Sequence, residues 1–452
     1  MKQKTGENSG KGKTPCVRKK HGVWFRIACI ALAAVILLVL IGVGFLVWYY
    51  TQDESDRTLS WVKSMIQEYY YEEIDEDVLD AATLDTLFGY NGEEAILDKY
   101  SAYYTASQYS ALQSERAGNQ SGLGISVIAE DDGILIYKVS GNSPAEEGGL
   151  CAGMYIYGYG ENDIQMVACS ATSELTSFLS GYSAGEEFVL YVGEDAETCE
   201  SYTLAKDTYV QNYVFYADSE YGYRFTGDDA DVLTQSESRL TYLPDDTAYI
   251  RLDSFAGDAA EQFEGMLDVF SERGKTDLIL DLRNDGGGQV SIMDEIAEFL
   301  CKDAPSSNFT VMSANYRSGT VSEYKADTNR YSEYFTEDSH ISVLANCNTA
   351  SASEALMGAM IDYGTIGYED IYLAEIDGTA KTYGKGIMQT TYPNVLTGEA
   401  IKLTTAKIYW PNGNSIHDIG ILPDDGAVAV TMSGYVEYND SMLQEIVSTY
   451  LS

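Results

Sequence analysis

The chain has 452 residues, of which 45% are hydrophobic and 12% aromatic, a composition typical of folded globular domains. This length allows two or three domains, each with a hydrophobic core of its own. The formal net charge of −42 argues against nucleic acid as a partner, because phosphate would be repelled, and a solvated acidic surface is the simplest explanation of the charge.

The N-terminal region differs from the rest of the chain in charge and hydropathy. The first 50 residues carry eight Lys or Arg and one Glu, so the remaining residues carry a net charge of −49. Residues 27–50 contain no charged side chain, and as a helix they would span roughly 36 Å, enough for a hydrocarbon core of about 30 Å. A cleaved signal peptide is the alternative, but the run is too long for one and no small-residue cleavage site precedes Thr51. We therefore predict a basic cytoplasmic tail over residues 1–22 and a single-pass cell-membrane anchor over residues 23–50, with the remaining chain outside.

The cysteines and histidines predict neither a metal site nor a cofactor. The seven cysteines include no Cys-x-x-Cys pair, and only three histidines are present. Five cysteines follow the predicted anchor, where disulfides can form, but the odd number leaves at least one thiol free and the pairing open. They are Cys151, Cys169, Cys199, Cys301 and Cys347.

Residues 51–119 are predicted to form a polar, helical N-terminal segment. Residues 97–105 in it have the pattern of a turn and cap that lead into a helix around residues 109–115.

Residues 120–206 switch to the alternating pattern of strands. Strands are predicted over residues 121–128, 133–139, 154–159 and 188–192, and a helix over residues 172–179. Ser143 caps a further short helix that has Pro144 at its first position. This order of elements, with its Gly-Leu-Gly-Ile turn, resembles a PDZ domain, a small β-sandwich whose turn amides hold a peptide C-terminal carboxylate while the peptide adds to the sheet edge. The resemblance places the peptide site at Leu123, Gly124, Ile125 and Val127.

Residues 207–245 are interpreted as a connecting segment without an assigned role, and residues 246–430 as an α/β domain. A helix over residues 259–272 precedes a continuously apolar strand over residues 277–282, which is typical of a buried parallel strand. Three glycines, at residues 286–288, follow this strand and indicate close approach of a ligand to the backbone rather than an ordinary loop. A phosphate loop is disfavoured because no Lys-Ser/Thr follows.

Ser351 lies where a predicted strand over residues 341–345 turns into a helix that ends near Gly364. Such a turn can present a hydroxyl beside unpaired backbone N–H groups, as a nucleophile requires. The spacing Ser351-x-x-Glu354 is also that of a capping box, in which the serine only closes the helix N-terminus. Lys385 follows between two glycines and is the candidate base. These residues by themselves leave the capping and the nucleophilic role open.

Together these segments resemble the carboxyl-terminal processing peptidases, also called tail-specific serine proteases. The family's motifs occur in order over nearly the whole chain beyond residue 50. They are residues 97–101, 278–288, 351–354, 383–386, 403–407 and 420–424. The resemblance implies a multidomain α/β (α+β) protein, with a ClpP/crotonase-like α/β catalytic core, a PDZ-like domain and one preceding transmembrane helix.

The resemblance also assigns catalytic roles. Ser351, rather than Ser353, is the expected nucleophile, Lys385 the general base and Gln389 the residue that assists the lysine. The expected oxyanion donors are the backbone N–H groups of Ala352 and of Gly287 or Gly288. Lowering the pKa of a lysine from about 10.4 to about 7 takes roughly 4.6 kcal/mol, which burial in an apolar pocket can supply.

Two other assignments of the catalytic residues are weaker. A Ser-His-Asp triad would need His340 or His417, and neither lies in a triad motif. Residues 368–379 exceed the spacing usual in the family, so Lys381 would replace Lys385 if the register shifted. We expect the additional residues to form a surface hairpin instead.

The predicted function is that of a membrane-anchored serine endopeptidase that binds exposed C-terminal tails through the PDZ-like domain and cleaves them. A catalytically silent peptide-binding scaffold is the alternative, and a metallopeptidase is disfavoured. We expect protein substrates with apolar tails and expect the acidic body to disfavour strongly acidic ones. Residues 431–452 are predicted to form a C-terminal helix, and because similar proteins dimerise through terminal segments, a homodimer is an open expectation.

Overall fold

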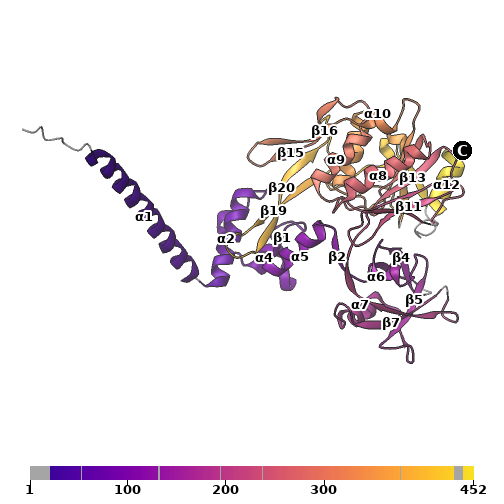
Figure 1. Cartoon of the computed structure of the whole chain (residues 1–452), viewed down its shortest axis with the longest axis horizontal. Coiled ribbons are helices and arrows are strands. Elements are labelled where there is room, and N and C mark those ends of the chain that lie inside the picture. Colours follow the sequence, from indigo (N-terminus) through magenta and orange to yellow (C-terminus); the bar gives the residue numbers. More distant parts are fainter. Residues whose placement is uncertain are drawn as a thin grey trace, which may run out of the picture.

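The computed structural model describes residues 21–51, 53–130, 133–193, 195–236, 238–376, 378–431 and 441–451. Most of the predicted tail, residues 1–22, lies outside these ranges. Within them the chain forms a long N-terminal helix, a helical segment, a small β domain and a larger α/β domain (Figure 1).

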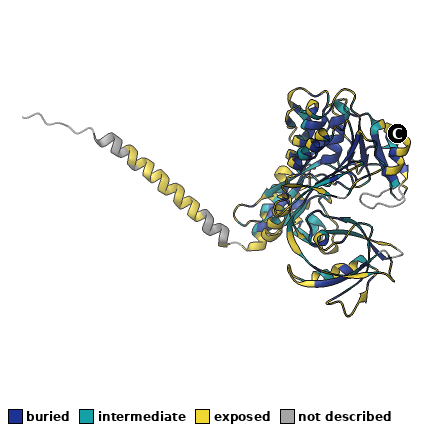
Figure 2. Ribbon diagram, turned by 45° about the vertical axis from the view of Figure 1, so that its right-hand side comes forward, coloured by how far each residue is buried: buried dark blue, intermediate teal, exposed yellow. Residues whose placement is uncertain are grey.

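Helix α1 (His21–Thr51) carries the predicted anchor and extends away from the body of the protein (Figure 1). Its described side chains between Ile27 and Gly44 are exposed, as the yellow stretch in Figure 2 shows. In the part of the chain that the structure describes, no helix combines the length and the apolarity needed to cross a membrane. The anchor over residues 23–50 therefore stays a prediction, and several of its side chains lie outside the description.

The N-terminal segment folds against the second sheet of the α/β domain. It consists of α2 (Glu54–Tyr69), α3 (Glu76–Ala81), α4 (Leu84–Phe88), the 3-10 helix η1 (Tyr90–Gly92), β1 (Ala102–Tyr104) and α5 (Ala106–Arg116). Val62 and Ile66 of α2 belong to the same buried cluster as Leu403 of the second sheet. The predicted cap before α5 is confirmed, because the Thr105 hydroxyl accepts a hydrogen bond from the N–H of Gln108.

The small β domain contains the strands and helices predicted from the alternating pattern. Its elements are β2 (Asn119–Gly122), β3 (Ile125–Glu130), β4 (Gly133–Val139), α6 (Pro144–Glu147), β5 (Tyr155–Gly160), β6 (Val167–Ala168), α7 (Thr172–Ser180), β7 (Glu187–Gly193) and β8 (Glu200–Ala205). Ser143 caps α6 as predicted, since its side chain accepts from the N–H of Glu146. The strands other than β2 form one antiparallel sheet in the order β3-β4-β5-β7-β8, with β6 beside β5, rather than the two sheets of a sandwich. The PDZ assignment itself stays a prediction.

Residues 207–245 do more than connect the two domains. β9 (Asp207–Val210) pairs with β2, so two antiparallel strands link the β domain to the rest of the chain. Three further strands, β10 (Val214–Ala217), β11 (Gly222–Thr226) and β12 (Val232–Ser236), extend the edge of the main sheet. The predicted domain boundary at residue 246 therefore divides a continuous sheet, because β10 pairs antiparallel with the first strand beyond that boundary.

The α/β domain is built on an eight-stranded sheet in the order β12-β11-β10-β13-β14-β17-β18-β21. Its parallel strands are β13 (Thr247–Leu252), β14 (Asp277–Asp281), β17 (Ile341–Ala345), β18 (Ile371–Glu375) and β21 (Val428–Thr431). Its principal helices are α8 (Ala259–Glu272), α9 (Val290–Leu300), α11 (Ala352–Asp362) and α12 (Ser441–Tyr450). Leu278 and Leu280 pack in the core with α8, α9 and α11, whereas Ile279 packs with α12. Both faces of β14 are therefore buried, which explains its continuously apolar sequence.

A second, antiparallel sheet lies beside the first (Figure 1). It contains β1 together with β15 (Ser307–Tyr316), β16 (Val321–Thr328), β19 (Ile387–Pro393) and β20 (Ala400–Tyr409). β20 pairs with β1, β15 and β19 and so joins the N-terminal segment to the α/β domain. The short helices in the connections are α10 (Tyr331–Tyr334), η2 (Tyr368–Asp370) and η3 (Pro423–Asp425). After β18, Ile376 and Thr379 pair across a tight turn, in agreement with the hairpin expected there.

The C-terminal helix predicted over residues 431–452 is described as α12, although Thr431 is the last residue of β21 and residues 432–440 lie outside the description. Its residues Met442, Leu443 and Ile446 are buried in one cluster with Ile279 and Leu344 of the main sheet. The apolar face of the helix is therefore filled by the chain itself. A homodimer through this segment stays a prediction.

Replacing Gly358 of α11 by alanine should destabilise the α/β domain. A Cβ at this position would come 2.1 Å from the indole ring of Trp410, which is 3% exposed. Alanine gains up to about 1 kcal/mol of helix propensity over glycine, whereas overpacking a core costs about 1–3 kcal/mol. We expect a net loss of about 1–2 kcal/mol in the free energy of unfolding, measured by denaturant titration. Gly286→Ala, whose Cβ would meet no atom within 4 Å, is the control, and an unchanged stability of Gly358→Ala would contradict the packing.

Candidate active site

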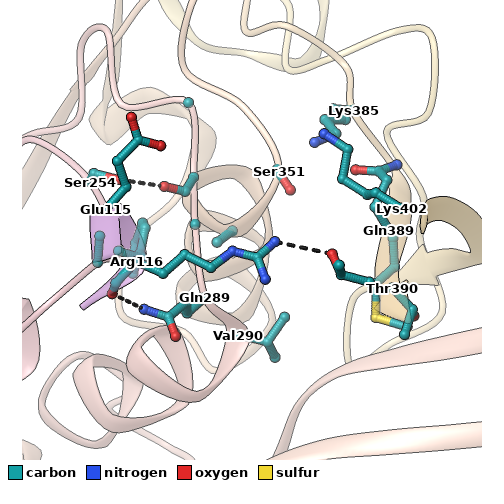
Figure 3. Close-up of a pocket in the computed structure, with 18 of the residues that line it drawn as sticks. Glu115, Arg116, Ser254, Gln289, Val290, Ser351, Lys385, Gln389, Thr390 and Lys402 are labelled. Carbon is teal, nitrogen blue, oxygen red and sulfur yellow. Dashed lines mark hydrogen bonds between the residues drawn. The ribbon is translucent and has the colours of Figure 1, made fainter. Parts of the chain in front are cut away.

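A cavity of about 790 Å³ lies where the loops of the α/β domain meet the N-terminal segment. It is lined by the glycine turn after β14, the start of α11, part of β19 and the end of α5. The predicted site residues that it brings together are Ser351, Lys385, Gln389, Ala352, Gly287 and Gly288. Figure 3 shows the side chains of Ser351, Lys385 and Gln389. The predicted peptide-binding residues lie elsewhere, at and just before β3 of the small β domain: Leu123, Gly124, Ile125 and Val127.

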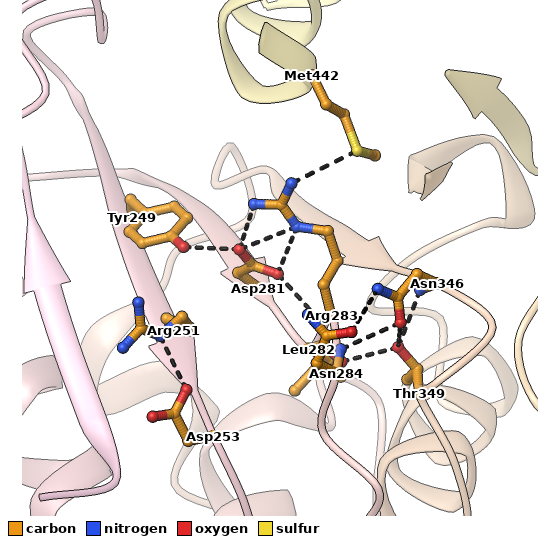
Figure 4. A network of polar contacts seen from close by, with 10 residues as sticks. All are labelled: Tyr249, Arg251, Asp253, Asp281, Leu282, Arg283, Asn284, Asn346, Thr349 and Met442. Atoms are coloured by element: carbon orange, nitrogen blue, oxygen red, sulfur yellow. Dashed lines mark hydrogen bonds and ion pairs between the residues drawn. The ribbon is translucent and has the colours of Figure 1, made fainter. Parts of the chain in front are cut away.

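Parallel pairing of β14 with β17 places the glycine turn beside the loop that carries Ser351. Polar groups then fix the two loops to each other (Figure 4). The N–H of Asn284 donates to Asn346 Oδ1 (3.1 Å), and Asn346 Nδ2 donates to Asn284 Oδ1 (2.9 Å). The Thr349 hydroxyl donates to the carbonyl oxygen of Leu282 (2.8 Å). These hydrogen bonds hold the serine loop in a defined position relative to the glycines.

A fully buried ion pair supports the start of the glycine turn (Figure 4). Arg283 Nε donates to both carboxylate oxygens of Asp281 (2.9 and 3.1 Å), and the Tyr249 hydroxyl donates to Asp281 Oδ2 (2.6 Å). Burial raises the pKa of Asp281, but the Arg283 guanidinium outweighs it, so this pKa is lowered and the carboxylate is ionised. Arg283 Nη1 also contacts Sδ of Met442 (3.6 Å), which links the turn to α12.

Ser351 stands at the strand-to-helix turn that the sequence predicts. Its backbone angles, φ 60° and ψ −114°, are unusual for a residue other than glycine and must be held by the surrounding structure. Its hydroxyl makes no cap hydrogen bond and lies at the cavity. Ser353, in contrast, is fully buried and donates its hydroxyl to the carbonyl oxygen of Asp285 (3.0 Å). Of the two serines, Ser351 is therefore the one that a substrate can reach.

Glu354 joins the serine loop to the lysine loop. Oε2 of its buried carboxylate accepts from the N–H groups of Ser351 (3.0 Å) and Lys385 (2.9 Å). Oε1 accepts from the N–H of Gly384 (2.8 Å) and from the hydroxyl of Thr382 (2.6 Å). Of the two hydrogen bonds of the predicted capping box, only the one from the N–H of Ser351 to the Glu354 carboxylate is therefore formed. Its other three donors lie 28 to 31 residues further along the chain, which is why the local spacing did not indicate them.

Lys385 is flanked by glycines because the main chain passes close on both sides. A Cβ at Gly384 or Gly386 would come within 2.9 Å of backbone nitrogens in residues 417–420. Larger residues would push this segment away and displace the lysine between them. The alternative base, Lys381, does not line the cavity.

Aromatic residues cover Lys385. Its Nζ lies 5.1 Å from the ring centroid of Tyr100, whose hydroxyl donates to the Tyr383 hydroxyl (3.1 Å). Lys99 Nζ also donates to the Tyr383 hydroxyl (2.7 Å), so residues from the turn before β1 enclose the lysine loop. Burial and then the positive charge of Lys402 lower the pKa of Lys385, which favours the neutral amine that a general base requires.

Gln389 lines the cavity but makes a different contact from the one expected. Because alternate residues of a strand share a face, the sequence predicts that Gln389 lies beside Lys385. The pairing of β19 with β20 shifts register between Met388 and Gln389, and Gln389 Nε2 donates to Thr404 Oγ1 (3.1 Å). Among the described residues no hydrogen bond joins Lys385 Nζ to Gln389 or to Ser351 Oγ. The assisting role of Gln389 stays a prediction.

Two backbone N–H groups beside Ser351 are available to an oxyanion. The N–H of Gly287 already donates to Asp285 Oδ1 (2.8 Å). Those of Gly288 and Ala352 have no backbone acceptor within the ranges that the structure describes. A Cβ at Gly287 would come 2.8 Å from the Ala352 nitrogen and so obstruct this amide. Of the two predicted glycine donors, Gly288 therefore fits better.

Neither a metal site nor a disulfide is formed by the described residues. They contain no group of three or more His, Cys, Asp or Glu side chains that could hold a metal ion. The five cysteines after the predicted anchor are all free thiols in the described structure.

Comparison with known proteins gives this arrangement a family. A sequence model of peptidase family S41 matches residues 246–426. This region is a peptidase family S41 domain. It contains both loops that Glu354 joins, together with the glycine turn between β14 and α9.

The relatives of this chain carry names that agree with the resemblance seen in the sequence. It is 28% identical over 320 residues to a carboxyl-terminal-processing protease of Synechocystis sp., which covers 70% of this chain and 65% of that one. It is 26% identical over 339 residues to a carboxy-terminal-processing protease of Bartonella bacilliformis, with 74% and 67% coverage. The chain thus spans about two thirds of the length of these relatives. A solved S41 protease from Bacteroides fragilis has the same fold, with a TM-score of 0.58, 15% identity and coverage of 86% of this chain and 97% of that one. The predicted family is confirmed.

Replacing Lys402 by glutamine should shift the pH dependence of the S41 domain. Lys402 lines the same cavity as Lys385, and after burial its charge is the main cause that lowers the pKa of Lys385. Tyr383, Glu354 and Asp98 act in the opposite direction. A base is active when neutral, so activity rises as the pH rises through its pKa. Without Lys402 this pKa increases, and the acid limb of the kcat/KM profile should move to higher pH. An acid limb that stays in place would contradict this coupling.

Proposed function

We propose that the protein is a serine endopeptidase that cleaves protein chains near their carboxyl termini, with Ser351 as nucleophile and Lys385 as general base. The observation that carries the proposal is the Glu354 carboxylate, which accepts hydrogen bonds from the N–H groups of both residues, at 3.0 and 2.9 Å. Both side chains line one cavity, and the S41 family and the names of the relatives support the same reaction.

The proposed reaction begins when neutral Lys385 Nζ takes the proton of the Ser351 hydroxyl and Oγ attacks the scissile carbonyl carbon. The N–H groups of Ala352 and Gly288 donate to the oxyanion that forms. The Lys385 ammonium gives its proton to the leaving amine, the C–N bond breaks, and an ester to Ser351 remains. Lys385 then deprotonates a water molecule, which hydrolyses the ester and restores the serine.

This reaction requires a movement of the lysine. In the described structure Lys385 Nζ lies over the Tyr100 ring rather than on Ser351 Oγ. A rotation of its side chain toward the serine would form the dyad, and Gln389, which lines the same cavity, is its proposed partner in that state. The described conformation therefore corresponds to one that precedes the reaction.

The small β domain is the proposed receptor for substrate tails. β3 ends its sheet, so its outer edge has no neighbour within that sheet and can accept a peptide strand. Gly124 has φ 82°, and a Cβ there would come 2.1 Å from Ser143, so the turn before β3 needs glycine. With Leu123, Ile125 and Val127 it forms the proposed site for an apolar carboxyl terminus.

Cleavage of a peptide with an apolar carboxyl terminus separates this proposal from a silent scaffold. The full-length protein should convert such a fluorescent peptide into two fragments, which mass spectrometry identifies. A peptide that binds but stays intact under all conditions would support the scaffold instead.

Attachment to a cell membrane through residues 27–50 is part of the proposal. Its support is the run of uncharged residues with the basic stretch before it. After cell fractionation the protein should remain with membranes in sodium carbonate at high pH, and its release into the soluble fraction would contradict the anchor.

A further inference from the structure

The cavity of the S41 domain is basic although the chain is strongly acidic. The sequence contains 70 Asp and Glu against 28 Lys and Arg. The charged residues that line the cavity are Arg116 and Lys402 against Glu115, and Lys385, whose pKa is lowered by burial and by Lys402, lines it as well. The sign of the charge is therefore reversed at the place where a substrate would lie.

Arg116 is the cation that reaches across this cavity. It is the last residue of α5, and Figure 3 shows its side chain extending across the cavity. Its Nη2 donates to Thr391 Oγ1 (3.3 Å) in β19, on the opposite wall. Its carbonyl oxygen accepts from Gln289 Nε2 (2.9 Å) and from the N–H of Gly257 (3.1 Å), which fixes the base of the side chain. The guanidinium is therefore held in the cavity by a neutral hydroxyl.

Most other arginines of the protein with a described contact are neutralised by carboxylates. Arg273 pairs with Asp218, and Arg330 pairs with Glu264. Within the described ranges no salt bridge of Arg116 is found, and Figure 3 shows Glu115, its neighbour in sequence, pointing away from the guanidinium. Several of the five N–H donors of this guanidinium remain available to a ligand.

We propose that Arg116 is a specificity-determining residue that binds a carboxylate of the peptide substrate beside Ser351. The proposal rests on the peptidase function above and names the chemistry that its cavity selects. Guanidinium and carboxylate form charge-assisted, frequently bidentate hydrogen bonds. Lys402, which is paired with Thr391 between β19 and β20, adds positive potential from the opposite wall. The carboxylate belongs either to an Asp or Glu side chain or to the carboxyl terminus of the chain. The prediction that the acidic body disfavours acidic substrates is thereby reversed for residues that enter the cavity.

Binding of matched peptides to the full-length Ser351→Ala variant tests this proposal without requiring catalysis. The peptides differ only in Glu against Gln next to the scissile bond, and each is made with a free and an amidated carboxyl terminus. We expect a carboxylate form to bind about 10-fold more tightly than its amide counterpart, as measured by fluorescence anisotropy at low salt. In Ser351→Ala/Arg116→Gln this ratio should fall to about 1. If the Glu-to-Gln affinity ratio falls, the carboxylate is a side chain. If the ratio of the free to the amidated peptide falls, it is the carboxyl terminus.

The control is Ser351→Ala/Lys325→Gln, which removes a positive charge paired with Glu323 away from the cavity and should keep the ratio. A ratio near 1 before Arg116 is changed, or one that survives Arg116→Gln, would overturn the proposal. The second outcome would place carboxylate recognition elsewhere, for example in the small β domain. Failure of the peptidase function is seen separately, as intact peptides with the unsubstituted protein.

Discussion

Peptide hydrolysis should be lost in Ser351→Ala, while peptide binding is retained. The substitution removes the hydroxyl oxygen that attacks the scissile bond but leaves the N–H that donates to Glu354. Removal of a catalytic serine from a peptidase costs on the order of 10⁶ in kcat, and we expect a loss of at least about 10⁴ in kcat/KM. Fluorogenic peptide cleavage measures kcat/KM, and fluorescence anisotropy measures the retained affinity.

Lys385→Met should reduce kcat/KM by a similar factor, because methionine keeps much of the chain length but cannot take a proton. The double variant Ser351→Ala/Lys385→Met should be no less active than either single variant, because the effects of substituting residues that act as one unit are not additive. Lys381→Met, which changes the alternative lysine outside the cavity, is the matched control and should retain activity. Full activity in either Ser351→Ala or Lys385→Met would exclude the assigned roles.

The second large effect is expected for Glu354→Gln. The Glu354 carboxylate accepts hydrogen bonds from four donors. One of them is the Thr382 hydroxyl, which accepts from the N–H of Ile421 (2.8 Å) and therefore directs its own proton to Glu354. An amide supplies one oxygen and directs its NH₂ at two of these donors. Because a buried unsatisfied donor costs about 1–3 kcal/mol, we expect a loss of about 2–4 kcal/mol in the free energy of unfolding.

The same substitution should lower kcat by about 10² or more, since a 1 Å displacement between reacting groups can cost that much. Glu337→Gln is the control, because Glu337 is 90% exposed and its pair with Lys302 is screened by solvent. Denaturant titration gives the stability and peptide cleavage gives kcat. If Glu354→Gln folds and cleaves like the unsubstituted protein, the glutamate does not hold the two loops together.

Local sequence patterns predict the parts of this fold that depend on neighbouring residues. The apolar run of β14, the caps formed by Thr105 and Ser143, and the strand-to-helix turn at Ser351 are present in the structure. Each depends on backbone groups only a few residues away, so composition and spacing are sufficient.

The features that the sequence does not reveal depend on distant partners. The residues of β10 to β12 read as a connection because nothing in their own sequence shows that β10 pairs with β13 or that β11 and β12 extend the same sheet. Glu354 fits a capping box locally, although three of its four donors come from residues 382–385. Arg116 contacts Thr391, 275 positions away. The hydrogen bond from Gln389 to Thr404 and the register shift in β19 also depend on β20, whereas the place of Gln389 beside Lys385 stays a prediction from strand alternation.

Phosphonylation of the full-length protein tests the central claim, the pairing of Ser351 with Lys385, most directly. A fluorophosphonate reacts with an activated serine and leaves an adduct that peptide mapping by mass spectrometry locates. The proposed mechanism predicts one adduct, on Ser351, that is lost in Lys385→Met. Labelling of Ser353 in place of Ser351, or undiminished labelling of Ser351 in Lys385→Met, would contradict it.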